Sequence, residues 1–283
     1  MASAAAPVIS ADPSTRPAGG GISATAPQPL VSIEGVTRRF VTRAGTEVSA
    51  LDNVTLAIER DQFVTVVGPS GCGKTTLMKL VGGIIQPTRG LVRLNGAPLT
   101  RPSRRIGMVF QRPILLPWCS VLDNVLFPLR MLGWPIAPRM AQARKLIELV
   151  GLRGFENALP MELSGGMQQR VSICRALIYD PEVLLMDEPF AALDAMMREE
   201  LGFELLRIWN EQRKTVVFIT HSISEAVMLA DRVIVMTARP GCIVMDVAIT
   251  LPRPRTPDTE FSDGFKQFVK TIKSAVYAEA KSH

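Results

Sequence analysis

The sequence predicts an α/β fold built on a mainly parallel sheet. Along most of the 283-residue chain, short apolar segments rich in β-branched residues alternate with segments of helical periodicity. The apolar segment 63–67 runs directly into a glycine-rich loop, which leads into a helical segment beginning near Lys74. Alternating strands and helices are typical of parallel sheets, whose ligands bind at the carboxyl ends of the strands.

The strand and helix predictions follow the chain in order. We expect strands at 31–34, 54–58, 63–67, 91–94, 106–110, 183–186, 215–220 and 233–236. We expect helices at about 74–81, 139–150, 165–179, 194–212, 223–230 and 261–280. Prolines punctuate the helical patterns of 112–160, which indicates a helical insertion in the α/β domain. The last helix is expected to be amphipathic and to pack on the body, because its apolar residues share one face: Phe265, Phe268, Val269, Ile272 and Val276.

Composition bounds the class of protein. Hydrophobic residues make up 47% and charged residues 20% of the chain, the balance of a globular protein with a substantial core. The net charge of +6 suits nucleotides, nucleic acid or an anionic membrane surface and does not choose among them. The four cysteines form no CxxC pair, so reduced thiols are expected, and two histidines exclude a histidine-rich metal site.

The sequence gives no signal for export or for crossing a membrane. Residues 1–30 are rich in Ala, Pro, Ser and Gly and lack the basic and apolar regions of a secretory signal, so we expect a disordered tail. No run of about 18 apolar residues occurs, so no transmembrane helix is expected and a cytosolic protein follows.

The loop between the strand 63–67 and the following helix matches the pattern GxxxxGK[ST]. Its residues are Gly68, Pro69, Ser70, Gly71, Cys72, Gly73, Lys74, Thr75 and Thr76. Glycines let consecutive backbone N–H groups turn inward around a phosphate, and the N-terminus of the helix adds positive potential. We expect Lys74 to reach the β- and γ-phosphates of a nucleotide and the Thr75 hydroxyl to ligate Mg²⁺. The alternative is an idle glycine-rich turn.

Cys72 lies inside this phosphate loop and has two interpretations. A positive environment would lower the pKa of its thiol and make it oxidisable. The simpler interpretation, which we favour, is that a small residue is tolerated there.

Two adjacent carboxylates follow the apolar strand at 183–186. Side chains of successive strand residues diverge, so Asp187 and Glu188 must do different work. Asp187 is placed to hold Mg²⁺ through its water shell, and Glu188 to orient and deprotonate an attacking water. Acids that end strands are common, and it is the phosphate loop upstream that makes this pair informative.

The segment 163–170, Leu-Ser-Gly-Gly-Met-Gln-Gln-Arg, resembles the signature motif of the ATP-binding cassette (ABC) ATPases, usually written LSGGQ. Met167 replaces the commonest glutamine and leaves the Ser-Gly-Gly core intact. The resemblance implies that each ATP lies between two protomers and contacts, from the opposite one, Ser164, Gly165, Gly166 and Gln168. The alternative is a serine N-cap followed by glycines. The family fold implied is that of a P-loop NTPase, an ABC-type ATPase core with an N-terminal antiparallel β subdomain and a helical insertion subdomain.

Further family elements appear in order along the chain. Gln111 resembles the glutamine that senses Mg²⁺ and the γ-phosphate, and His221 resembles the switch histidine on the γ-phosphate. The segment Ala192–Asp194 resembles the loop that touches the other protomer, with Asp194 near the nucleotide. Phe40 sits where the family has an aromatic residue that stacks on adenine, since stacking needs only a π-face. The alternative for Phe40 is a plain core residue.

The resemblance covers about residues 31–250, with a helical subdomain at about 112–180, and leaves 251–283 as a C-terminal extension. A single cassette without a coiled-coil insertion favours a transporter subunit over a soluble relative that acts on nucleic acid or ribosomes. An apolar cluster at 113–118, beside Gln111, could receive a short helix from a membrane subunit. Packing within the helical insertion is the alternative.

The finer resemblance is to bacterial importer ATPases of the nitrate, sulfonate and taurine group. It is carried by 111–118, 163–171, 237–241 and 251–255. It implies a second copy, integral-membrane permease subunits and a periplasmic solute-binding protein as partners, at the cytoplasmic face of the bacterial inner membrane, with no nucleic acid. Importers of pyrimidine precursors or aromatic acids remain alternatives, because an importer ATPase never touches the cargo.

Overall fold

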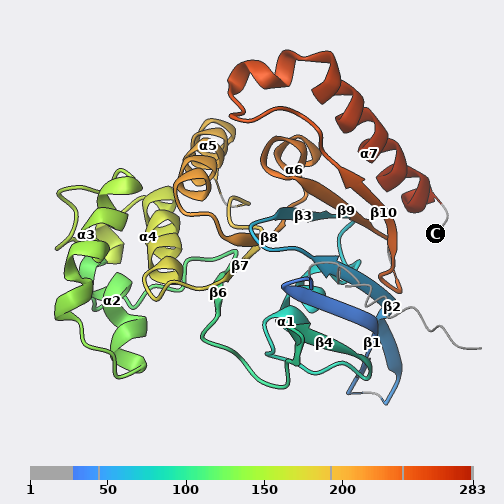
Figure 1. Cartoon of the computed structure of the whole chain (residues 1–283), viewed down its shortest axis with the longest axis horizontal. Coiled ribbons are helices and arrows are strands. Elements are labelled where there is room, and N and C mark those ends of the chain that lie inside the picture. The colour runs from blue at the N-terminus through green and yellow to red at the C-terminus, as the bar shows by residue number, and fades with distance from the viewer. Residues whose placement is uncertain (1–27, 44, 192, 238, 282–283) are drawn as a thin grey trace, which may run out of the picture.

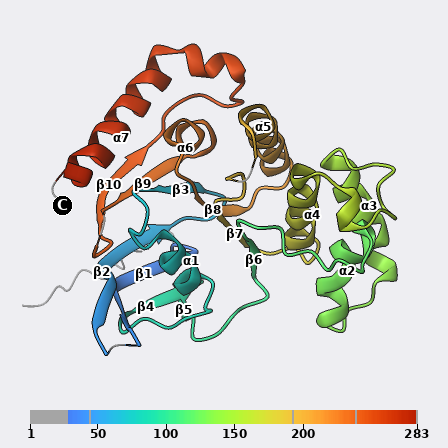
Figure 2. The same ribbon diagram turned by 180° about the vertical axis from the view of Figure 1, so that it is seen from behind.

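The computed structural model describes residues 28–281, apart from 44, 192 and 238. Figure 1 shows two sheets, with helices α2 (Val121–Met131), α3 (Met140–Leu149) and α4 (Gly165–Leu177) grouped at one side. We refer to residues 121–177 as the helical arm. Figure 2, the view from behind, shows that the arm lies next to β6 and away from the C-terminal helix α7 (Asp263–Lys281).

The central sheet has six strands in the order β10-β9-β3-β8-β7-β6. Five of them run parallel, and β10 pairs with β9 in the antiparallel direction at one edge. All residues of β3, β7 and β8 are buried, as expected for strands covered on both faces. The bounds are β3 (Phe63–Val67), β6 (Ile106–Val109), β7 (Val183–Asp187), β8 (Thr215–Ile219), β9 (Arg232–Met236) and β10 (Ile243–Ala248). The predicted mainly parallel α/β fold is confirmed.

The N-terminal strands form a second, antiparallel sheet in the order β2-β1-β4-β5. Val31 pairs with Ile58 on one side and with Leu94 on the other. The helix α1 (Lys74–Val81) contacts β2, β7 and β8, so it lies between the two sheets. The bounds are β1 (Val31–Val41), β2 (Glu47–Ile58), β4 (Arg89–Leu94) and β5 (Ala97–Pro98). The antiparallel β subdomain expected from the family resemblance is therefore present.

The central sheet separates two hydrophobic clusters. Strand side chains alternate between them, since Val64 and Val66 join one cluster while Phe63 and Val67 join the other. The cluster of Val64 and Val66 also contains the core of the antiparallel sheet and of α1. The opposite cluster takes in the helical arm, α5 (Ala195–Glu211), α6 (Ile223–Leu229) and part of α7. The described residues also form three short 3₁₀ helices: η1 (Ala137–Arg139), η2 (Pro160–Glu162) and η3 (Pro257–Phe261).

The C-terminal helix packs as its sequence pattern predicts. Phe265 and Ile272 are buried, and Phe268, Val269 and Val276 pack partly buried against the same cluster. The helix contacts α6 and β9. None of the helices within the described part of the chain has both the length and the apolar character that a membrane crossing requires.

Several parts of the structure differ from the prediction; β2, for example, begins at Glu47 and not at Val54. Strand β10 was not expected, because it is a half-buried edge strand whose outward positions include the apolar Val244. Helix α2 runs through Pro128, where the sequence suggested an interruption, and its start is capped by Ser120, which accepts a hydrogen bond from the Asp123 backbone N–H. Leu30, which its composition placed with the tail, is buried in the core, and its carbonyl accepts from the Asn95 N–H. Residues 1–27 of the expected tail lie outside the described residues.

Candidate functional site

The carboxyl ends of β3, β8 and β7 bring the predicted site residues to one edge of the central sheet. These strands are direct neighbours, so the phosphate loop after β3, His221 after β8 and Glu188 after β7 meet there. Gln111 follows β6, the next strand along, and is exposed. Residues far apart in the sequence therefore share one site, because their strands are neighbours in the sheet although they are distant along the chain.

The phosphate loop is held in shape by its glycines and by the segments behind it. Gly71 and Gly73 have φ values of 79° and 93°, a region that favours glycine. A Cβ on Gly73 would lie 2.7 Å from the Ala50 carbonyl oxygen, and one on Gly68 would lie 2.6 Å from the Met236 carbonyl oxygen. No side chain caps the N-terminus of α1, so no capping side chain occupies its first N–H groups.

Lys74 lies against its own loop. Its side chain is buried, and Nζ donates to the carbonyl oxygens of Gly68 at 2.8 Å and Pro69 at 3.0 Å. The ammonium group is thus fixed at the loop by backbone acceptors, in the position from which the motif predicts contact with phosphates.

Cys72 is buried, and its Sγ atom lies 3.7 Å from Lys74 Nζ. Burial raises the pKa of the thiol, and the nearby ammonium of Lys74 opposes that shift without reversing it. The alternative of a lowered thiol pKa is therefore wrong, because desolvation outweighs the positive charge. The structure supports the simpler interpretation of Cys72 as a small residue that fits the loop.

The burial of Cys72 predicts slow alkylation. We expect iodoacetamide to modify Cys72 slowly in the native protein at pH 7, because the reactive thiolate is scarce and the sulfur is covered. Mass spectrometry after limited labelling should find Cys119, which is partly exposed, modified before Cys72. Rapid labelling of Cys72 in the folded protein would contradict this assignment.

Thr75 and Asp187 form an oxygen-rich pair beside the loop. The Thr75 hydroxyl donates to Asp187 Oδ1 at 3.3 Å. Burial raises the pKa of the Asp187 carboxyl, the Thr75 hydroxyl opposes the shift, and the neighbouring charge of Glu188 adds to it. A buried carboxylate of this kind gains from a nearby cation, so the pair fits a divalent ion that prefers oxygen ligands.

Glu188 and His221 make the second close pair. Glu188 Oε1 lies 2.7 Å from His221 Nε2, and the carboxylate is 13% exposed while the imidazole is half exposed. Glu188 has a φ of 46°, and its N–H donates to the Ile219 carbonyl at 2.9 Å. The chain therefore turns at Glu188, so this carboxylate meets His221 while Asp187 meets Thr75.

The signature segment lies on the helical arm, apart from α1 in both views (Figures 1 and 2). Ser164 is the N-cap of α4, where its Oγ accepts from the Met167 N–H, and Gly165 has open space around it. Gln168 turns to its own backbone, since its amide donates to the carbonyls of Pro160 and Leu163. The structure thus does not bring the signature residues to the phosphate loop of the same chain.

The remaining predicted residues lie at the surface. Asp194 is the N-cap of α5 and accepts from the Met197 N–H at 2.9 Å, while Ala192 lies outside the described residues. Phe40 is 38% exposed, with the Arg38 guanidinium 4.6 Å from its ring centroid. This exposure excludes Phe40 as a plain core residue and leaves a ring face accessible for stacking.

Sequence reasoning missed two residues that contact the phosphate loop. A Cβ on Gly241 would collide with the Cys72 carbonyl oxygen, so the turn between β9 and β10 packs directly behind the loop. The guanidinium of Arg239 lies 3.5 Å from the position of a Cβ on Gly71. Both residues belong to the segment 237–241, which resembles importer ATPases in sequence and here packs against the phosphate loop.

A phosphate loop lies at the carboxyl edge of a parallel sheet, together with the pairs Thr75–Asp187 and Glu188–His221. These features define the class of P-loop nucleotide hydrolases. Residues 51–191 match the family model described as ABC transporter. An uncharacterised ABC transporter ATP-binding protein of Methanocaldococcus jannaschii is 49% identical over 252 residues, 89% of this chain and 94% of that protein. The aliphatic sulfonates import ATP-binding protein SsuB of Bacillus cereus is 42% identical over 242 residues, 86% of this chain and 94% of that protein.

Solved structures agree. The ATP-binding cassette MJ0796, in a dimeric post-hydrolysis state bound to ADP and Pi, is 32% identical with a TM-score of 0.69, over 79% of this chain and 100% of that one. The protein cbiO1 of Clostridium perfringens, part of an ABC transporter complex, has a TM-score of 0.71 over 89% of this chain and 98% of that one; at 24% identity it shows the fold alone. The chain belongs to the ABC transporter family. It is an ATP-binding subunit of an ABC transporter and hydrolyses ATP.

Proposed function

We propose that the chain energises a bacterial importer of a small anion such as a sulfonate, taurine or nitrate. The 42% identity to an aliphatic sulfonates import protein supports this cargo class. The partners would be integral-membrane permease subunits and, through them, a periplasmic solute-binding protein. The chain would bind peripherally at the cytoplasmic face of the inner membrane.

The observation that carries the mechanism is the position of the signature segment. Ser164 and Gly165 are exposed on the helical arm, apart from α1 of the same chain. We infer that they complete the nucleotide site of a second copy, so that two ATP molecules lie between two chains. The relative MJ0796 was solved as a dimer bound to ADP and Pi, which supports this assembly.

Each close pair then has a role in hydrolysis. Glu188 accepts the proton of the attacking water, and His221, 2.7 Å away, holds that carboxylate in place and faces the γ-phosphate. Lys74 and the loop N–H groups bind the β- and γ-phosphates. Gln111, Asp194 and Phe40 are proposed to contact the γ-phosphate and Mg²⁺, the second copy and the adenine, respectively.

Thr75 and Asp187, with Gln111, are the residues that would hold Mg²⁺, partly through water. When bound, Mg²⁺ would neutralise charge on the phosphates. Among the described residues, no group of three or more His, Cys, Asp or Glu side chains gathers to hold a metal. This fits an ion held by one or two protein oxygens together with the phosphates of the substrate.

The proposed permease site is the apolar groove between the helical arm and β6. Its volume is 590 Å³, and its lining includes Met108, Phe110, Ile114 and Phe127. Ile114 and Trp118 are exposed by 60% and 74%, so they do not simply pack within the arm. The buried Asn124 fixes the loop that carries them, because its amide donates to the Leu116 carbonyl at 3.1 Å and its oxygen accepts from the Leu116 N–H at 2.8 Å.

A charged substitution in the exposed segment 113–118, part of which lines this groove, should disrupt the transporter. We expect Trp118→Glu to lower the membrane-bound fraction of the chain at least tenfold, since a buried unpaired carboxylate opposes association. The measurement is sedimentation of the chain with membranes from its own cells. Phe261→Glu is the matched control, because Phe261 is also 74% exposed but lies in η3. Equal membrane binding by both variants would place the permease contact elsewhere.

Transport assays test the function itself. Cells without this chain should lose ATP-dependent uptake of one of three labelled solutes: an alkanesulfonate, taurine or nitrate. Unchanged uptake of all three would contradict the cargo class and direct the assay to pyrimidine precursors and aromatic acids. ATP turnover stimulated by nucleic acid, without any permease, would contradict the importer role.

A further inference from the structure

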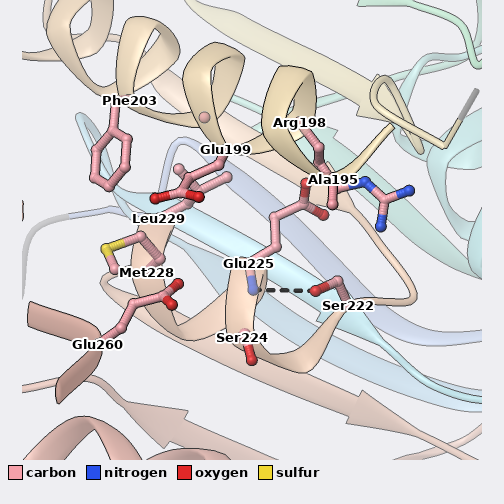
Figure 3. Close-up of a pocket in the computed structure, with 11 residues that line it drawn as sticks. Ala195, Arg198, Glu199, Phe203, Ser222, Ser224, Glu225, Met228, Leu229 and Glu260 are labelled. Atoms are coloured by element: carbon pink, nitrogen blue, oxygen red, sulfur yellow. Dashed lines mark hydrogen bonds between the residues drawn. The ribbon is translucent and has the colours of Figure 1, made fainter. Parts of the chain in front are cut away.

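A partly buried polar network lies behind the Glu188–His221 pair. A pocket between α5 and α6 has a volume of 190 Å³. Figure 3 shows that Arg198, Ser222 and Glu225 lie close together in it. A second cavity, of 120 Å³, is lined by the same three residues and also by Glu188 and His221. Arg198, Ser222 and Glu225 therefore border both the catalytic pair and the pocket behind it.

The hydrogen bonds of this network converge on Thr220, the residue before His221. The Thr220 hydroxyl donates to the Glu225 carboxylate and accepts from the Ser222 N–H at 3.0 Å. The Ser222 hydroxyl in turn accepts from the Glu225 N–H at 3.3 Å, so Ser222 caps α6. The two residues that flank His221 are thus both tied to Glu225.

We propose that Glu225 is a positioning residue for hydrolysis, which holds His221 against Glu188 through the Thr220 hydroxyl and the Ser222 cap. The Glu225 carboxylate accepts a hydrogen bond from the Thr220 hydroxyl, so a lone pair of that hydroxyl stays available for the Ser222 N–H. The two hydrogen bonds fix the turn that carries the His221 imidazole. The inference rests on the roles proposed above for Glu188 and His221.

The charges around Glu225 make this link sensitive to pH. Burial raises the pKa of Glu225 to about 7, with the Thr220 hydrogen bond and Arg198 opposing and Glu188 adding to the shift. The charged or titratable groups that line the two cavities around Glu225 are Glu188, Arg198, Glu199, His221 and Glu260. One carboxylate oxygen of Glu225 and the Arg198 Nε atom are buried without a hydrogen-bond partner. The negative charge of the Glu225 carboxylate is therefore only partly stabilised by hydrogen bonds. As the pH falls through about 7, Glu225 becomes neutral and its bond to Thr220 loses charge assistance.

The test compares the steady-state ATP turnover of wild type and Glu225→Gln between pH 6 and pH 8.5. The glutamine keeps the shape and cannot ionise, so we expect its kcat at pH 8 to fall about tenfold, with the KM for ATP unchanged within twofold. We also expect the rise of kcat with pH to be smaller than in wild type. His221 is present in both proteins, so the difference between the profiles belongs to Glu225. A variant with the wild-type profile would overturn the proposal.

Variants of Thr220 separate positioning from folding. Thr220→Ser keeps the hydroxyl and should retain turnover, whereas Thr220→Val should lose about as much as Glu225→Gln. The double variant Thr220→Val/Glu225→Gln should lose no more than either single one, because both act through one link. Additive losses, or a fall in melting temperature without a change in the pH profile, would overturn the proposal. His221→Ala is the reference: if it leaves turnover intact, the proposed role of His221 fails, and if it abolishes turnover while Glu225→Gln keeps the wild-type rate and pH profile, only the positioning role fails.

Discussion

Glu188→Gln should lower ATP turnover by about 10²- to 10⁴-fold, the usual contribution of a general base. The amide keeps the shape of the side chain and can still meet His221, 2.7 Å from the carboxylate in the native protein. It cannot accept the proton of the attacking water. ATP binding should therefore survive, and the bound ATP should hold two copies together for longer than in wild type.

Turnover and size-exclusion chromatography with light scattering, with and without ATP, measure the two effects. Glu211→Gln is the control, since it removes a carboxylate at an exposed position on α5. A Glu188→Gln protein that stays monomeric with ATP at high concentration would contradict the proposed assembly of two chains. A variant that hydrolyses ATP at the wild-type rate would remove Glu188 from the chemistry.

Lys74→Ala should abolish turnover and weaken ATP binding by about 10- to 150-fold, the value of a hydrogen bond to a charged group. Its ammonium also donates to the Gly68 and Pro69 carbonyl oxygens, so the substitution loosens the loop as well as removing the phosphate contact. Fluorescent-nucleotide titration measures the affinity. Lys145→Ala is the matched control, because it removes the same charge from an exposed position on α3. Wild-type affinity in Lys74→Ala would contradict the assigned role of the loop.

Much of this site could be predicted because the signals are local. The phosphate loop, Asp187, Glu188 and His221 each follow a short apolar segment, and strand ends of this kind meet at one edge of a parallel sheet. What the sequence could not show is which of these side chains touch. The contact between Glu188 and His221 depends on β7 and β8 being neighbours and on the turn at Glu188, and both follow from the assembled sheet.

Other features escaped prediction for physical reasons. In strand β10 the outward residues Val244 and Ala248 are apolar, so its sequence lacks the alternation of apolar and polar residues that marks a half-buried strand. Glu225 stands three residues after the N-cap Ser222, a spacing that suggests an ordinary helix start. Its carboxylate bonds Thr220 instead, and that partner becomes visible only when the turn before α6 is folded.

The two hydrophobic clusters on either side of the central sheet give the site a further property. The phosphate loop is anchored in one cluster through Cys72 and Leu77, while Phe190, two residues after Glu188, belongs to the other. The carboxyl edge of the central sheet, where the site lies, is thus the boundary between two separately packed layers. A nucleotide bound there would contact residues of both layers. Loss of its terminal phosphate would then weaken the connection between the two layers. The bound nucleotide would then link the two layers within each chain, as well as linking two chains.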